Sequence, residues 1–258
     1  MTGILYLCAT PIGNLGDMTP RVVETLRSVD LIAAEDTRNS LKLMTHFEIH
    51  TPMTSYHEYN KVEKAYTLIA KLQEGQNIAL ITDAGTPAIS DPGEVLVRMC
   101  LEAGIRVTSL PGAAACITAL TMSGLSTRRF CFEGFLPPDK KERTEILEDC
   151  REESRTMIFY EAPHHLKKTL QELAVMPTTI FAATDYFETN DPRGEYVLVI
   201  EGKSYEEKKQ EAQKNWLEMP VEEHVALYES QGFDRKEAMK KAAKDRGVSK
   251  RDIYQSLL

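Results

Sequence analysis

The chain has 258 residues, of which 42% are apolar and 27% are charged, as in ordinary globular proteins of one or two domains. Its net charge of −8 argues against a general nucleic-acid coat protein, because overall repulsion weakens non-specific binding to a polyanion. No apolar run approaches the roughly 18 residues of a membrane span, and no basic leader precedes the first apolar segment. We therefore expect a cytoplasmic protein without a membrane anchor, whose contacts with nucleic acid are local.

The five cysteines are odd in number and far apart, and none forms a Cys-x-x-Cys motif. Neither a zinc site nor a disulfide framework is indicated, so we expect buried thiols and no metal. The sequence also lacks G-x-G-x-x-G, a Gly-Lys-Ser/Thr phosphate loop, and flanking glycines around Ser90. Dinucleotide-binding, P-loop and nucleophile-elbow chemistries are therefore excluded.

Apolar runs alternate with amphipathic segments through about residue 125. Thr19 and Pro20 predict the N-cap and first position of a helix, and glycines follow the ends of later helical segments. Strand–helix alternation predicts an α/β fold with a mainly parallel sheet and helices on both faces. Strands are expected at 5–9, 29–34, 53–56, 78–82 and 105–110, and further helices at 62–72, 94–103 and 114–123.

A second block begins after a linker at 126–129. We expect a mixed α/β domain over 126–220 that follows an N-terminal domain over 1–125. Its helix at 140–153 is highly charged, which is typical of a solvated face. Its strands are expected at 130–135, 156–160, 179–183 and 195–200, with a further helix ending at Leu173.

The tail at 221–258 is predicted to be helical, with small core residues and a break at Gly247 that give it helix-turn-helix character. It is locally basic, and Lys250 and Arg251 are candidates for contact with nucleic acid. A simple packing appendage is an equally good interpretation of this pattern.

The loop at 81–93 is the strongest candidate for a binding site. It follows an apolar strand. It contains two carboxylates, Asp83 and Asp91, together with Gly85, two prolines that restrict the backbone and two side-chain hydroxyl groups. In open α/β sheets such loops bind ligands at the carboxyl ends of the strands. A tight turn with the two aspartates as caps is the alternative. A phosphate between these carboxylates would be repelled by about 1 kcal/mol or more per close pair, so a cationic or ribose-bearing ligand is favoured.

Polar loops also follow the other predicted strands, at Thr10, Glu35, His57 and Pro111, so their residues are expected to converge on one rim of the sheet. Asp36 beside Arg38, and His57 beside Glu58, are candidates for acid/base or orienting groups. A surface ion pair of little energetic weight is the alternative for Asp36 and Arg38.

Six segments together resemble the class III, tetrapyrrole-methylase-like S-adenosylmethionine methyltransferases, and within them the 16S ribosomal RNA cytidine 2′-O-methyltransferase subfamily. The resemblance covers nearly the whole chain, and its combination of motifs is specific although each motif alone is not. The segments lie at residues 8–17, 34–38, 83–93, 110–112, 132–137 and 159–164.

The resemblance implies methyl transfer from S-adenosylmethionine to a ribose 2′-hydroxyl of 16S rRNA, within the 30S subunit, by a homodimer. The implied catalytic candidates for base or hydroxyl alignment are Asp36, His57, Glu58 and Asp83, with a water as the alternative final proton acceptor. Asn14 and Arg38 join Lys250 and Arg251 as implied substrate-binding residues. The implied cofactor-binding residues are Pro11, Gly85, Thr86, Pro87, Ala88, Ile89, Ser90, Pro111, Gly112, Ala113, Ala115, Tyr160 and Val199.

The chain departs from the family pattern after residue 183, where about a strand and a loop are missing near Thr184–Asp191. RNA contacts from that region are therefore in doubt, whereas the cofactor motifs are untouched. Two other functions stay open: a class III methylase acting on a tetrapyrrole or a protein histidine derivative, and a non-catalytic ribosome-binding factor that uses the basic tail. The apolar segments 114–123 and 130–135 are candidates for the dimer contact, with core packing as the alternative.

Overall fold

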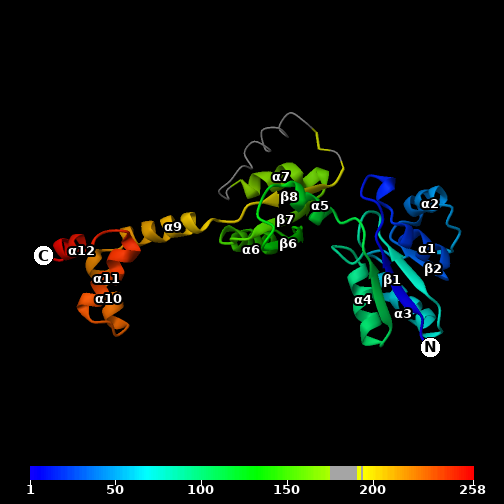
Figure 1. Ribbon diagram of the computed structural model, residues 1–258, viewed down its shortest axis with the longest axis horizontal. Helices are drawn as coiled ribbons and strands as arrows, with labels where there is room; N and C mark the ends of the chain where they lie inside the picture. The colour runs from blue at the N-terminus through cyan, green and yellow to red at the C-terminus, as the bar shows by residue number, and fades with distance from the viewer. Residues whose placement is uncertain (175–190, 193) are drawn as a thin grey trace.

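A computed structural model describes residues 1–174, 191–192 and 194–258. The chain forms an N-terminal domain, a second domain and a helical tail, which follow one another along the longest axis of the molecule (Figure 1). The expected strand at 179–183 and most of the segment between Thr184 and Asp191 lie outside the described residues.

The N-terminal domain contains a five-stranded sheet in the order β3-β2-β4-β1-β5. Every pairing between neighbours is parallel, which confirms the expected parallel α/β sheet. The central strands are almost fully buried, as parallel strands covered on both faces are. The strands are β1 (Ile4–Cys8), β2 (Leu31–Ala34), β3 (Met53–Ser55), β4 (Ile78–Ile81) and β5 (Arg106–Leu110).

Helices cover both faces of this sheet, with α1 and α2 on one side and α3 and α4 on the other (Figure 1). Two separate apolar clusters, one on each face, form the core. Thr19 caps α1 by accepting from the Val22 amide at 3.3 Å, as the sequence predicts. The helices are the 3-10 turn η1 (Leu15–Asp17), α1 (Pro20–Ser28), α2 (Thr37–His46), α3 (Lys61–Gln73) and α4 (Gly93–Glu102).

The second domain contains the sheet β6-β7-β8, in which β6 and β7 are parallel and β8 is antiparallel to β7. The helix α5 packs on this sheet although it lies within residues 1–125, and its Cys116 and Leu120 join Ile158 in one buried cluster. The elements are α5 (Ala115–Met122), β6 (Phe130–Phe135), α6 (Lys140–Arg151), β7 (Thr156–Glu161), α7 (Pro163–Leu173) and β8 (Tyr196–Ile200).

The tail consists of four helices, and its core is built from alanines with Val225, Met239 and Ile253. Gly247 adopts a left-handed conformation after α11, and Ser249 begins α12 with a capping box, so the predicted helix–turn–helix is confirmed. No described helix is both long and apolar enough to cross a bilayer. The helices are α9 (Tyr205–Glu218), α10 (Val221–Ser230), α11 (Arg235–Arg246) and α12 (Lys250–Ser256).

The charged helix α6 is solvated along most of its length, but Arg143 is buried, which the sequence did not indicate. Its Nε lies 2.6 Å from Glu172 of α7, and its Nη2 donates to Thr169 at 2.7 Å. Thr169 in turn donates to the buried carboxylate of Glu161 at 2.5 Å. A polar network therefore joins α6, α7 and β7 beneath the second sheet.

Arg143→Ala is expected to lower the free energy of unfolding of the second domain by about 2–3 kcal/mol, because it leaves a partly buried carboxylate and a buried hydroxyl without their partner. The calorimetric transition of that domain should move down accordingly. Arg151→Ala is the matched control: Arg151 lies on the same helix and its ion pair with Glu148 is exposed, so its loss should cost less than about 0.5 kcal/mol. Equal shifts in the two variants would contradict the buried network.

Candidate active site

The loops after β1 and β4 are joined directly, because these strands are neighbours in the sheet. The Thr10 amide donates to the Gly85 carbonyl at 2.9 Å, and the Gly85 amide donates to the Thr10 carbonyl at 3.1 Å. The Thr10 hydroxyl adds a bond to the Thr82 carbonyl at 3.1 Å. The two loops therefore form one rigid wall at the carboxyl end of the sheet.

The loop from Thr82 to Gly93 is held in an unusual backbone conformation. Ala88 and Ser90 have φ angles of 67° and 61°, in the left-handed region that non-glycine residues rarely adopt, at a cost on the order of 1–3 kcal/mol each. Asp91 stabilises this course, since its carboxylate accepts from the Ile89 amide at 3.1 Å and from the Gly93 amide at 2.7 Å. Asp91 thus acts as the local cap that the sequence offered as an alternative, while the strained backbone around it is a mark of functional loops.

The loop after β5 is fixed against this wall. The Thr86 hydroxyl donates to the Ala113 carbonyl at 2.8 Å. Gly112 packs so closely on β1 that a Cβ built there would lie 2.5 Å from Cβ of Ala9. Glycine is therefore required at this position for the β5 loop to reach Thr86.

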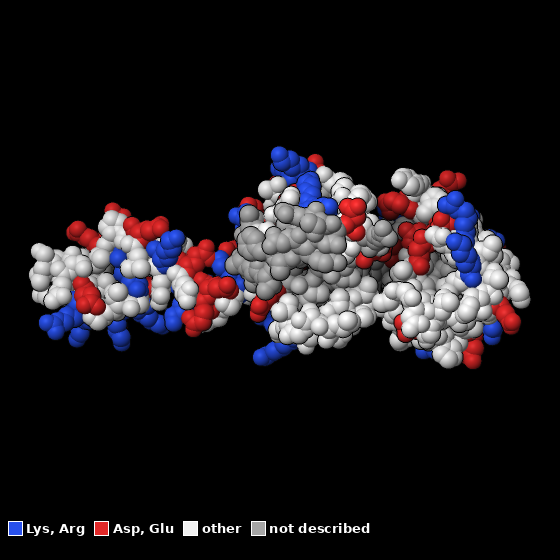
Figure 2. Space-filling view, turned by 90° about the horizontal axis from the view of Figure 1, so that it is seen from above, with Lys and Arg blue, Asp and Glu red and all other residues white. Residues whose placement is uncertain are grey.

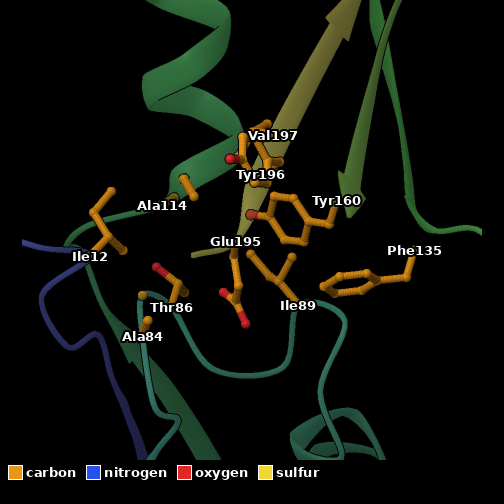
Figure 3. A pocket seen from close by; sticks show the side chains of 12 residues that line it. Ile12, Ala84, Thr86, Ile89, Ala114, Phe135, Tyr160, Glu195, Tyr196 and Val197 are labelled. Carbon is orange, nitrogen blue, oxygen red and sulfur yellow. The ribbon is translucent and has the colours of Figure 1, made fainter. Parts of the chain in front are cut away.

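A cavity of about 260 Å³ lies between the two domains. Figure 3 shows Ile12, Ala84 and Thr86 on one side, with Tyr160 and Val197 of the second sheet opposite them. The wall is mostly apolar, with a few polar groups that point inward. The lining residues are Ile12, Ala84, Gly85, Thr86, Ile89, Ala114, Ala115, Phe135, Tyr160, Glu195, Tyr196 and Val197.

A second cavity of about 310 Å³ adjoins the first, because the two share Ala84, Ile89, Phe135, Tyr160 and Glu195. Its other lining residues are mostly polar or acidic: Glu35, Thr82, Asp83, Ser90 and Asp91. Four carboxylates thus surround one opening. Such a site attracts a cationic or hydroxyl-rich ligand and repels a phosphate.

Tyr160 connects the second sheet to α5 at the boundary of the two cavities. Its hydroxyl accepts from the Cys116 amide at 3.1 Å, and its ring packs edge-on against Phe132 and Phe135 at centroid distances of 5.0 and 5.5 Å. Burial raises the pKa of Tyr160 to about 12, with the hydrogen-bonded Cys116 a smaller cause. The phenol is therefore neutral at physiological pH and serves as a hydrogen-bonding and packing group.

The four predicted catalytic residues occupy different environments. Asp83 lines the acidic cavity, where its carboxylate accepts from the Asp36 amide at 3.3 Å and from Nδ2 of Asn39 at 3.4 Å. His57 and Glu58 do not line either cavity: Nε2 of His57 lies 3.3 Å from Nδ2 of Asn60, and Glu58 pairs with Lys61 at 2.5 Å. The structure therefore brings Asp83 to the site and not the His57–Glu58 pair.

Asp36 caps α2 and forms a two-point pair with Arg38, at 2.9 Å between Nη2 and Oδ2 and 3.2 Å between Nε and Oδ1. These hydrogen bonds from Arg38, followed by that of the Arg38 amide, lower the pKa of Asp36 from 3.8 to about 2. The structure thus contains the surface ion pair that the sequence offered as the alternative to an acid/base role. A carboxylate of such low basicity is a weak proton acceptor near neutral pH.

The lowered pKa of Asp36 gives a pH prediction. A depressed carboxyl pKa contributes stability that is present above its ordinary value of 3.8 and is lost as pH falls toward about 2. Arg38→Gln should therefore raise the pKa of Asp36 toward 3.8, so that its carboxyl carbon titrates between pH 3 and 5 by NMR. Lys42→Gln, in the exposed part of the same helix, should leave this titration unchanged. A titration of Asp36 that is the same in all three proteins would contradict the pairing.

The predicted cofactor residues fall into two groups. Gly85, Thr86, Ile89, Ala115 and Tyr160 line the first cavity, Ser90 lines the second, and Val199 lines an adjacent surface hollow. The others are absent from the walls of these three spaces and lie in the loops behind them: Pro11, Pro87, Ala88, Pro111, Gly112 and Ala113.

Glu35 lines the second cavity, on the rim of the sheet where it was expected, whereas the sequence did not single out Phe135, Glu195 and Tyr196 for the cavity. Their position depends on how the second sheet faces the first, for which the sequence carries no local signal. Asn14 caps the turn η1 by accepting from the Gly16 amide at 2.9 Å. Lys250 and Arg251 lie on α12, at the end of the molecule farthest from the N-terminal domain (Figure 1).

The profile of the tetrapyrrole (corrin/porphyrin) methylases matches residues 4–186, which include all six segments that carry the resemblance. The chain belongs to this family. It is 46% identical to a Synechocystis protein named ribosomal RNA small subunit methyltransferase I, over 98% of this chain and 96% of the relative. It is likewise 46% identical to the Bacillus subtilis protein of that name, over 98% and 93%.

A solved structure of diphthine synthase has the same fold as this family member, with a TM-score of 0.63 and 11% identity over 78% of this chain and 91% of that one. The alignment with the Synechocystis relative spans 274 positions, more than the 258 residues here. The relative therefore carries residues that this chain lacks.

Proposed function

We propose that the protein transfers a methyl group from S-adenosylmethionine to a ribose 2′-hydroxyl of a cytidine in 16S ribosomal RNA. The observation that carries this proposal is the 46% identity, over nearly both full lengths, with relatives named ribosomal RNA small subunit methyltransferase I. The paired cavities between the domains supply a site of suitable chemistry. The ribosomal substrate implies a cytoplasmic location.

The residues of the first cavity fit S-adenosylmethionine. Its wall combines small and apolar side chains at Ile12, Ala84, Ala114 and Val197 with the Thr86 hydroxyl and a backbone approach at Gly85. A Cβ at Gly85 would lie 3.3 Å from Cγ2 of Ile12 and would narrow this space. Pockets of this kind hold flat heterocycles through apolar contact and orient them through a few polar groups.

Bound S-adenosylmethionine would supply an electrophilic methyl group on a sulfonium cation. The carboxylate of Glu195, which points into the cavity in Figure 3, adds negative charge beside it and favours a cationic ligand. The acidic second cavity would hold the ribose, whose hydroxyls donate to carboxylates. Alignment of the reacting atoms between two rigid walls can contribute several kcal/mol to lowering the barrier.

Asp83 is the residue we propose to orient the 2′-hydroxyl and accept its proton. It lines the acidic cavity, and its two hydrogen bonds at 3.3 and 3.4 Å are long, which leaves its carboxylate free to accept another. Methyl transfer would break the ribose O–H bond and the bond between the methyl carbon and the sulfonium sulfur, and would form a C–O bond. The sulfur would leave as a neutral thioether, and the proton would pass to Asp83 and then to water. A positioned base of this kind contributes about 10²–10⁴-fold to the rate.

The proposal is tested by mass spectrometry, which maps ribose methylation in 16S rRNA with and without the protein. Undermodified 30S subunits should gain one methyl group on a cytidine ribose in the presence of S-adenosylmethionine. Methylation of a tetrapyrrole or of a protein histidine derivative, and none of the rRNA, would overturn it. Tight binding of S-adenosylmethionine without RNA would count against a purely structural ribosome-binding factor.

We also propose that the protein is a homodimer and that it methylates 16S rRNA within the 30S subunit. The apolar side chains Ile117 and Met122 of α5 and Phe130 and Phe135 of β6 are exposed in the single chain, which supports a contact between copies on this side. Sedimentation equilibrium should give twice the mass of the chain. A monomer at all concentrations would exclude the dimer without affecting the chemistry.

A further inference from the structure

One segment of the tail carries a charge opposite to the net charge of the whole chain. Residues 235–251 include eight Lys and Arg against two Asp and Glu, a net charge of +6 in a protein whose total is −8. In Figure 2 the Lys and Arg side chains gather along one edge of the tail, whereas Asp and Glu side chains gather between the N-terminal and second domains. The region around the proposed site is therefore poorly suited to hold a phosphate backbone.

Five of these cations are exposed, and we call the surface that carries them the basic ridge. Three of them recur every fourth residue on α11 and so project from one side of the helix, about 6 Å apart along its axis. The side of α11 that faces the core of the tail carries Ala238 and Ala242, which are fully buried. The ridge consists of Lys236, Lys240 and Lys244 of α11 and Lys250 and Arg251 of α12.

None of the five cations of the ridge takes part in an ion pair among the described residues. By contrast, Lys241 lies 4.3 Å over the ring of Phe233, and Arg246 is buried against His224. Beside the ridge, Tyr254 of α12 exposes 56% of its surface. Free cations next to an exposed aromatic ring are the combination that binds RNA through phosphate contacts and base stacking.

Side-chain contacts at both ends of α9 connect the ridge to the second domain. Trp216 of α9 stacks on the buried ring of His224 at 4.0 Å, and Arg246 of α11 donates to Nδ1 of His224 at 3.0 Å. At the other end of α9, Lys208 donates to the Glu152 carbonyl at 2.6 Å. The ridge is thus linked through α9 to the second domain, which forms one wall of the cavities.

We propose that the basic ridge binds the phosphate backbone of the RNA substrate at a place remote from the methyl-transfer site, an inference that rests on the proposed function. The acidic cavity accepts the ribose to be methylated, and the ridge supplies the affinity that this cavity cannot. An acidic protein surface is the alternative occupant, which the experiment below excludes or reveals. Binding through phosphates must weaken as salt displaces the bound RNA.

Lys240→Glu with Lys244→Glu tests the ridge in the full-length protein. We expect binding of a protein-free 16S rRNA fragment, measured by fluorescence anisotropy, to weaken about 10-fold or more, and the slope of log affinity against log salt to fall by about 1–2. The apparent KM for the RNA should rise while kcat at saturation and the calorimetric affinity for S-adenosylmethionine are unchanged. The matched control is Arg98→Glu with Arg106→Glu, two exposed cations of the N-terminal domain.

The outcomes separate this inference from the proposed function. RNA binding and salt slope equal to those of the unchanged protein would overturn the ridge, even if rRNA methylation is found. Equal losses in the control pair would also overturn it, since net charge alone would then explain them. Loss of affinity for 30S subunits but not for the protein-free fragment would assign the ridge to a ribosomal protein instead. Absence of rRNA methylation in the unchanged protein would refute the proposed function, while the binding measurement still decides the ridge.

Discussion

Gly85→Arg is expected to abolish binding of S-adenosylmethionine, with the dissociation constant raised about 100-fold or more, a loss of about 2.7 kcal/mol. Gly85 lines the cavity of about 260 Å³ and has a φ angle of 84°, so any side chain there is strained and projects toward Ile12 and Ala113. A guanidinium side chain would fill the space and add a positive charge where a sulfonium cation must bind. Isothermal titration calorimetry measures the loss directly.

Gly104→Arg is the matched control for this substitution. Gly104 has a φ angle of 69°, so the backbone strain is similar, but a Cβ there meets nothing within 4 Å and the residue lies at the end of α4 away from the cavities. The control should keep its affinity for S-adenosylmethionine. Undiminished binding in Gly85→Arg, or equal losses in both variants, would refute the assignment of the cavity.

Asp83→Asn is expected to lower kcat about 100- to 10,000-fold while the affinity for S-adenosylmethionine stays within about twofold. Asparagine keeps the shape of the side chain and can still accept from the Asp36 amide, so the change removes the basic oxygen and little else. Single-turnover methylation of RNA at saturating cofactor separates this chemical step from binding.

Glu94→Gln controls for the loss of one negative charge, because Glu94 is an exposed carboxylate in the first turn of α4. It should methylate RNA at the rate of the unchanged protein. Full activity in Asp83→Asn would exclude Asp83 as the base. An equal loss of kcat in Glu58→Gln would instead assign the role of base to Glu58, in the loop after β3, where it pairs with Lys61.

The parallel sheet of the first domain could be predicted from the sequence because its signals are local. Buried runs such as Ile78–Ile81 are apolar throughout, and caps such as Thr19 precede the helices. The helix α2 was not predicted, and only Ser40 and Met44 of its ten residues are buried. α9 was also missed because it buries none of its residues, although its capping box at Ser204 was a readable signal.

Only the part of the candidate site that lies within one loop could be predicted from the sequence. Gly85, Thr86 and Ile89 follow a buried strand, and their turn chemistry identified them. Phe135 and Glu195 reach the same cavity from the second domain, through the packing of α5 on that sheet rather than through any pattern around them. The buried pairing of Arg143 was hidden for a similar reason, as its partner lies on another helix.

The chain segment that leads from β5 of the first sheet to α5 forms part of the cavity wall. β5 belongs to the first sheet and α5 packs on the second, while Ala114, the N-cap of α5, and Ala115, its first residue, line the cavity. A ligand that touches both walls therefore favours one range of angles between the domains, and by thermodynamic linkage the domain angle sets the affinity for that ligand. Substitutions at the domain boundary that contact no ligand should consequently change the affinity for the cofactor. Cofactor binding and the angle between the domains are therefore thermodynamically coupled.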